Sequence, residues 1–171
     1  MNGAVVTIIG LDPGLRHTGW GIIRADGNRL SFVAAGTVDP APAMPMAARL
    51  AVLADGLRGI IAAHRPDEAA VEETFVNGNA RAALKLGQAR GMALLTPAEA
   101  GLPVSEYAAN LIKKSVTGYG HADKQQVQAM MRILLPGIGE APAADAADAL
   151  AIAVCHAHHR QAVELLSRIR A

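Results

Sequence analysis

The sequence contains few of the features that stabilise secreted or membrane-bound proteins. Its one cysteine, Cys155, cannot form an internal disulfide, which excludes a disulfide-stapled scaffold and favours a reducing, cytoplasmic environment. Acidic residues or glycines interrupt the apolar stretches well short of a membrane span, and no basic residue precedes the first apolar run. We therefore expect neither a signal peptide nor a membrane anchor.

Aromatic residues and net charge are also scarce. Aromatics make up 3% of the chain, too few for the stacking platforms on which single-strand nucleic-acid binders rely. The net charge is only +1, but the segment 79–132 contains seven lysines and arginines against three acids. Because phosphate binding depends on where charge lies, this basic segment favours recognition of nucleic acid by shape and backbone.

The 171 residues, 51% of them hydrophobic, are enough for one domain over residues 1–171 with a sizeable core. Apolar periodicity and turn residues predict a three-stranded meander followed by alternating helices and strands. This order indicates an α/β protein with three α/β/α layers and a mixed sheet. Strands are expected at 5–11, 19–24, 30–38, 69–74 and 104–107, and helices at 47–64, 79–95, 122–135 and from 146 onwards.

Four acids are placed to converge at one edge of this sheet. Asp12 ends the first strand, and Glu72 lies near the end of the fourth. Asp145 and Asp148 stand three residues apart at the start of the last helix, so both carboxylates project from one face. Carboxylates so close repel one another unless a cation lies between them, and an all-oxygen site suits Mg²⁺ or Mn²⁺. Such a site is what a two-metal phosphodiesterase requires.

Each acid also has a structural interpretation. Asp145 could be a helix N-cap with Asp148 as its capping-box partner, and Asp12 before Pro-Gly could simply form a turn. Glu73 competes with Glu72, because alternation along a short strand does not say which side chain faces the site. Four further acids are expected to have no special role: Asp67, Glu68, Glu106 and Asp123.

Two other groups of residues have competing interpretations. Phe75 follows Glu72 by three residues; most phenylalanines are core residues, but the turn-forming segment 76–79 favours a half-exposed ring at the active-site edge. Cys155, His158 and His159 have helical spacing that could suit zinc, with His156 beside them. Because the cluster lacks the paired spacings of structural zinc sites, a helix surface is favoured instead.

Five motifs follow one another in order and cover nearly the whole chain: Gly10-Leu11-Asp12-Pro13-Gly14 with Thr18-Gly19-Trp20-Gly21, Val71-Glu72-Glu73-Thr74-Phe75 with Asn79-Ala80, Leu84 to Gly91, Ile112 to Val127, and Asp145 to Ala151. Together they resemble one known family, the RuvC Holliday-junction resolvases. The family usually has tyrosine where Trp20 stands, a difference that concerns packing more than chemistry.

The resemblance implies an RNase H-like fold with a mixed five-stranded sheet and catalytic metal ligands Asp12, Glu72, Asp145 and Asp148. It also implies two Mg²⁺ ions in each active site, with Mn²⁺ as a plausible substitute. The expected substrate is four-way junction DNA, nicked on two opposed strands by a homodimer that works with a RuvA–RuvB branch-migration complex. The expected DNA contacts are Phe75, Arg81, Lys113 and Lys124.

Three other functions were weighed. An actin-like phosphotransferase also has an Asp followed by glycines after its first strand, but no second phosphate-binding hairpin follows Ala70. A non-catalytic junction-binding protein would not need all four acids. Another RNase H-like nuclease acting on a different structured nucleic acid is the nearest alternative.

Overall fold

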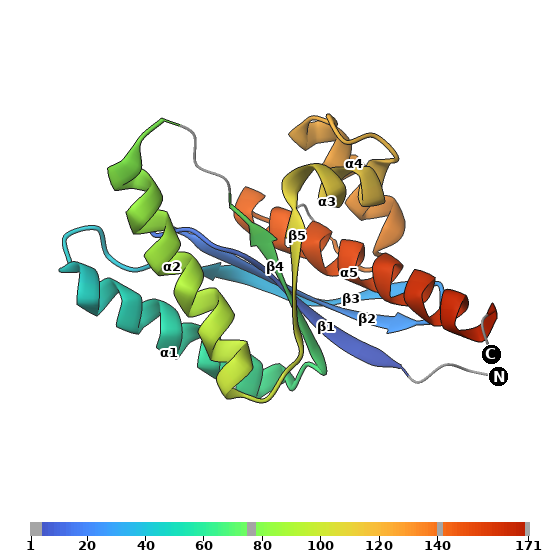
Figure 1. The fold of residues 1–171 in the computed structure, drawn as a ribbon, viewed down its shortest axis with the longest axis horizontal. Coiled ribbons are helices and arrows are strands. Elements are labelled where there is room, and N and C mark those ends of the chain that lie inside the picture. The colour runs from blue at the N-terminus through green and yellow to red at the C-terminus, as the bar shows by residue number, and fades with distance from the viewer. Residues whose placement is uncertain (1–4, 75–77, 140–141, 170–171) are drawn as a thin grey trace.

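The computed structural model describes residues 5–74, 78–139 and 142–169, and it contains a mixed five-stranded sheet (Figure 1). The strand order is β3-β2-β1-β4-β5. β1 pairs antiparallel with β2 and parallel with β4, while β2–β3 is antiparallel and β4–β5 parallel. The expected sheet is confirmed. The strands are β1 (Val6–Asp12), β2 (Thr18–Asp26), β3 (Arg29–Val38), β4 (Glu68–Glu73) and β5 (Val104–Ala108).

Helices cover both faces of the sheet, so the three-layer prediction is also confirmed (Figure 1). Successive β1 side chains point to opposite faces: Ile8 packs in the core beneath α3, α4 and α5, and Ile9 in the core beneath α1 and α2. Both are fully buried, as expected for a central strand covered on two sides. The helices are α1 (Met46–His64), α2 (Ala80–Glu99), α3 (Ala109–Thr117), α4 (Lys124–Leu134) and α5 (Ala144–Ile169).

Three glycines let α5 lie unusually close to the sheet. A Cβ on Gly10 would clash with the carbonyl oxygen of Ala149, and one on Gly19 with that of Asp145. A Cβ on Gly21 would lie 2.7 Å from Cγ of Leu150. Since any side chain there would push the helix away, these glycines determine how near the start of α5 comes to the end of β1.

Two expectations about the helices were wrong. The sequence pattern predicts no helix at 109–117, but this segment forms α3. The helix follows β5 without a break and is capped by Gly118 in the left-handed conformation. Its nine residues are too few for the apolar period to stand out. The second helix was expected to end at residue 95, yet α2 continues through the buried Pro97 to Glu99. Among the described residues, no helix is both long enough and apolar enough to cross a bilayer.

Candidate active site

Three carboxylates meet where β1 ends and α5 begins. Asp12 is the last residue of β1, and Asp145 and Asp148 lie in the first turns of α5. One oxygen from each lies within 4.8 Å of the others, and all three residues are half-buried. Among the described residues, no other group of three or more acids, histidines and cysteines is close enough to hold a metal ion. The packing of α5 on glycines of β1 and β2 produces this convergence.

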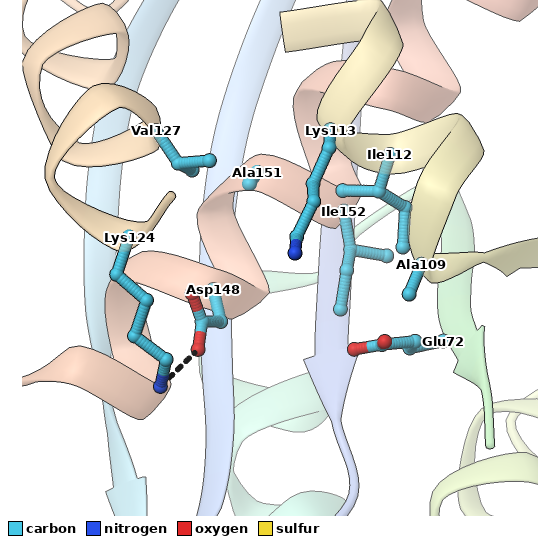
Figure 2. A pocket seen from close by; sticks show the side chains of 9 residues that line it. All are labelled: Glu72, Ala109, Ile112, Lys113, Lys124, Val127, Asp148, Ala151 and Ile152. Carbon is cyan, nitrogen blue, oxygen red and sulfur yellow. Dashed lines mark hydrogen bonds and ion pairs between the residues drawn. The ribbon is translucent and has the colours of Figure 1, made fainter. Parts of the chain in front are cut away.

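The fourth acid, Glu72, faces the same region from the neighbouring strand β4. It lines a cavity of about 210 Å³ together with Asp148, Lys113 and Lys124 (Figure 2). Glu72 comes from β4, the lysines from α3 and α4, and Asp148 from α5. The other side chains lining the cavity are apolar: Ala109, Ile112, Val127, Ala151 and Ile152. The structure therefore brings all four predicted acids to one edge of the sheet.

Burial and mutual repulsion make the carboxylates hard to ionise together. Desolvation, followed by the negative charges of Glu72, Asp148 and Asp145, raises the pKa of Asp12 to about 7. The pKa of Glu72 is raised by the same two causes, burial first and then Asp148, although Lys113 and Lys124 act against the rise. Without a cation, Asp12 is thus only partly ionised at neutral pH.

The two lysines supply positive charge from the other side of the cavity. Nζ of Lys124 lies 3.5 Å from Oδ2 of Asp148, and the side chain of Lys113 extends into the cavity between Asp148 and Glu72 (Figure 2). Lys124 is otherwise exposed. Both ammonium groups are placed to meet a phosphate that approaches the acids.

The donor set fits a hard divalent cation. All four groups are carboxylates, which Mg²⁺ and Mn²⁺ prefer, and the spacing of three of them allows one ion to be shared. Neighbouring negative charge helps to raise the pKa values of Asp12 and Glu72, and a divalent ion would compensate this charge.

The family model for the crossover junction endodeoxyribonuclease RuvC matches residues 8–156. The RuvC of Rhodopseudomonas palustris (strain TIE-1) is 58% identical, over 97% of this chain and 95% of its own length. That of Rhizobium etli is 63% identical, over 91% of each. The structure of T. thermophilus RuvC in complex with a Holliday junction substrate superposes with a TM-score of 0.85 at 34% identity, covering 91% of this chain and 95% of that one.

This chain belongs to the RuvC family. It is therefore an endodeoxyribonuclease, as the motifs indicated. The yeast mitochondrial resolvase Ydc2, at 13% identity and a TM-score of 0.62, shares the fold.

The structure also decides between the alternatives for two of the acids in this RuvC protein. Asp145 is not an N-cap, because α5 begins at Ala144 and the carbonyl of Ala143 already accepts the amide of Ala147. Its side chain is therefore free to face Asp12. Glu72, and not its neighbour Glu73, is among the described residues that line the cavity, since adjacent strand residues face opposite sides.

Two of the predicted DNA contacts lie beyond β4. Arg81 is exposed in the first turn of α2, just after Asn79, whose side chain caps the helix by accepting from the amide of Ala82. Phe75 lies outside the described residues, so its choice between core and surface stays a prediction.

All four acids expected to have no special role have structural partners. Asp123 is the N-cap of α4, in a capping box with Gln126. The carboxylate of Asp67 accepts the amide of Thr7, and Glu106 pairs with Arg90. Sequence spacing carries no signal for the last two pairs, because their partners lie far away along the chain.

Glu68 is the last of these acids, and its partners lie in the segment around Cys155 and His156. That segment was expected to be a helix surface, and this expectation is wrong. Cys155 is fully buried and His156 is 7% exposed. Nε2 of His156 donates to Glu68 over 2.7 Å, while its Nδ1 accepts from the hydroxyl of Tyr107 over 2.8 Å. The Nε of Arg160 donates to the same carboxylate over 2.9 Å. The face of α5 that carries Asp148 therefore also packs toward the sheet two turns later, at Cys155 and His156.

Proposed function

We propose that this chain resolves four-way (Holliday) DNA junctions by metal-dependent phosphodiester hydrolysis, with Asp12, Glu72, Asp145 and Asp148 as the catalytic metal ligands. The observation that carries the proposal is that Asp12, Asp145 and Asp148 meet at one point, beside a cavity that Asp148 and Glu72 line together with Lys113 and Lys124. Its biological setting would be recombination and DNA repair in the cytoplasm, and residues 1–171 would act as one nuclease domain.

The four acids would hold two Mg²⁺ ions, with Mn²⁺ as a substitute. When bound, such a pair activates the attacking water and stabilises the leaving oxygen. The chain's own carboxylates fix where the negative charge lies. Asp12, whose pKa is raised to about 7, would lose its proton as the metal binds.

The two lysines have separate roles in this proposal. Lys113 extends into the cavity and would bind a phosphate oxygen. Lys124, whose Nζ lies 3.5 Å from Asp148, would stabilise the negative charge that accumulates on the phosphate during attack. Arg81, on the exposed first turn of α2, would contact the DNA backbone further from the metals.

Two symmetric nicks require two active sites, and we propose that a homodimer supplies them. A two-fold axis shared with the junction would place one site on each of two opposed strands. The outer side of α2 offers a surface for such a contact, because Leu84 is 71% and Leu95 is 44% exposed. Gly87 and Gly91 lie on the same side with open space where a Cβ would be. Sedimentation that shows only monomer, with and without junction DNA, would contradict the dimer.

The proposed partners of the dimer are the four-way junction and a RuvA–RuvB branch-migration complex. Phe75 is proposed to wedge against unstacked bases at the branch point, where stacking contributes on the order of 1–3 kcal/mol per base. Phe75→Ala would then fold normally but cut poorly. If Phe75 is instead a core residue, the variant loses roughly 3–5 kcal/mol of stability and keeps its activity per folded molecule.

The proposed function is tested by comparing substrates under single-turnover conditions in Mg²⁺. Four-way junctions should be nicked on opposed strands, with plain duplex and RNA–DNA hybrid cut far more slowly. Preferential cutting of the hybrid would indicate a different RNase H-like nuclease. Tight junction binding with no cutting in Mg²⁺ or Mn²⁺ would indicate a non-catalytic binding protein.

A further inference from the structure

One arginine links the strand that carries Glu72 to two neighbouring elements. The side chain of Arg90, in α2, reaches back to the end of β4, where its Nε donates to the main-chain carbonyl of Glu72 over 3.1 Å. Its Nη2 pairs with the carboxylate of Glu106, in β5. The Arg90 side chain is only 21% exposed. A single guanidinium thus joins α2, β4 and β5 at the proposed metal ligand.

The end of β4 needs such a clamp. Glu72 is the next-to-last residue of β4, and the chain leaves the sheet directly after Glu73. The pairing of β4 with β1 ends at Val71. At Glu72, β4 is therefore paired only with β5. Strand ends held by few hydrogen bonds open most easily. A carboxylate that binds metal must nevertheless stay within about 0.5 Å of its working position.

The chemistry of arginine suits this position. A mostly buried cation is costly unless it is paired, and Glu106 provides the pairing charge. The planar guanidinium can direct Nε to a carbonyl and Nη2 to a carboxylate at the same time, whereas the single ammonium of lysine cannot hold both in fixed directions. The side chain does not line the cavity described above, so its action on the site passes through the Glu72 backbone.

We propose that Arg90 is a positioning residue for the nuclease reaction, holding the end of β4 so that the Glu72 carboxylate meets the metal in the right place. The proposal rests on the proposed role of Glu72 as a metal ligand. Glu106 supports it by fixing the guanidinium.

The test compares Arg90→Met, which keeps an unbranched apolar stem but removes both contacts, with Arg58→Met as a matched control. Arg58, in α1, also ties α2 to a neighbouring element through a carboxylate: it pairs over 3.0 Å with Glu99 at the other end of α2, and with Asp55 in its own helix. Single-turnover cutting of a four-way junction is measured against Mg²⁺ concentration. Junction binding in Ca²⁺ at several salt concentrations and thermal unfolding without metal are measured alongside.

Arg90→Met should raise the Mg²⁺ concentration for half-maximal cutting by roughly tenfold and slow cutting at saturating Mg²⁺, with junction binding within about twofold of wild type. Arg90→Lys should not restore the Mg²⁺ dependence, because it cannot keep both contacts. Glu106→Gln leaves the hydrogen bond from Arg90 to the Glu72 carbonyl in place, so it should raise the half-maximal Mg²⁺ concentration by less than Arg90→Met does. If Arg90→Met fails to fold, Glu106→Gln provides the test. Arg58→Met should keep the wild-type Mg²⁺ curve.

A wild-type Mg²⁺ curve for Arg90→Met overturns the proposal, and so does an equal shift in Arg58→Met, which would indicate general loosening of α2. Weaker binding with a flatter salt dependence and an unchanged Mg²⁺ curve would make Arg90 a DNA contact instead. Glu72→Gln separates this proposal from the one it rests on. If Glu72→Gln cuts like wild type, the ligand assignment is wrong; if it is inactive while Arg90→Met is normal, only the positioning role fails.

Discussion

β4 and α5 contribute to two polar clusters of opposite character, and the second of these also contains Asp12 of β1. At one end, Glu68 accepts from His156 and Arg160. Burial acts to raise the pKa of Glu68, but these hydrogen bonds outweigh it and the pKa is lowered. At the other end, burial and neighbouring acids raise the pKa values of Glu72 and Asp12. The charge of the first cluster is balanced within the protein, whereas the charge of the second would be balanced by the proposed cation. The two clusters would thus separate stability from the proposed function along one helix.

The largest effect is expected from neutralising the second cluster. Asp12→Asn keeps the shape of the side chain but removes a charge needed to hold the ions, so nicking should fall below detection while junction binding persists. Single-turnover cutting and gel-shift binding measure the two. Replacing Mg²⁺ with Ca²⁺ should likewise allow binding without cutting, because its looser geometry misplaces the reacting groups. Wild-type nicking by Asp12→Asn would show that the site is misassigned.

The second prediction sets the two clusters directly against each other. Glu68→Gln should destabilise the metal-free protein by about 2–3 kcal/mol, because it removes the half-buried negative charge that accepts from both His156 and Arg160. Glu72→Gln should leave the unfolding free energy of the metal-free protein unchanged or raise it, since it relieves repulsion from Asp148. Urea denaturation in the presence of a chelator measures both. Equal destabilisation by Glu68→Gln and Glu72→Gln would show that the two clusters do not differ in their contribution to stability.

The raised pKa of Asp12 makes the stability of the metal-free protein depend on pH. Because the pKa of Asp12 is about 7 in the folded protein and about 4 in the unfolded chain, the metal-free folded state binds the extra proton between these values. Its contribution to stability is therefore present at low pH and lost as pH rises through about 7.

Metal and proton compete for the same carboxylate, so the Mg²⁺ concentration for half-maximal cutting should rise as pH falls below about 7, by up to about tenfold per unit. Titrations of cutting rate with Mg²⁺ between pH 6 and 8 test this. A half-maximal concentration that is independent of pH would contradict the raised pKa.

The smallest effects are expected at the lysines. Lys113→Ala and Lys124→Ala should each reduce the slope of log affinity against log salt by roughly 0.9, the value for one released counterion. Lys124→Ala should also slow cutting more than it weakens binding, given its place beside Asp148. Lys114→Ala, at an exposed neighbouring position of α3, is the matched control. Equal losses of cutting and binding would reduce Lys124 to a phosphate tether.

Much of this protein follows from the sequence by itself. Apolar runs, apolar periodicity and turn residues predicted every strand and four of the five helices, and the placement of Asp12 at the end of a buried strand predicted an acidic edge. These features are local, so a short stretch of chain contains all the information they need.

Only the tertiary structure decided how distant segments use their polar groups. It placed Glu72 rather than Glu73 in the cavity, freed Asp145 from a capping role, and buried His156 against Glu68. It also aimed Arg90 at the Glu72 carbonyl. Each of these outcomes depends on partners many residues away and on how closely α5 and α2 approach the sheet, a distance set by packing rather than by any local pattern.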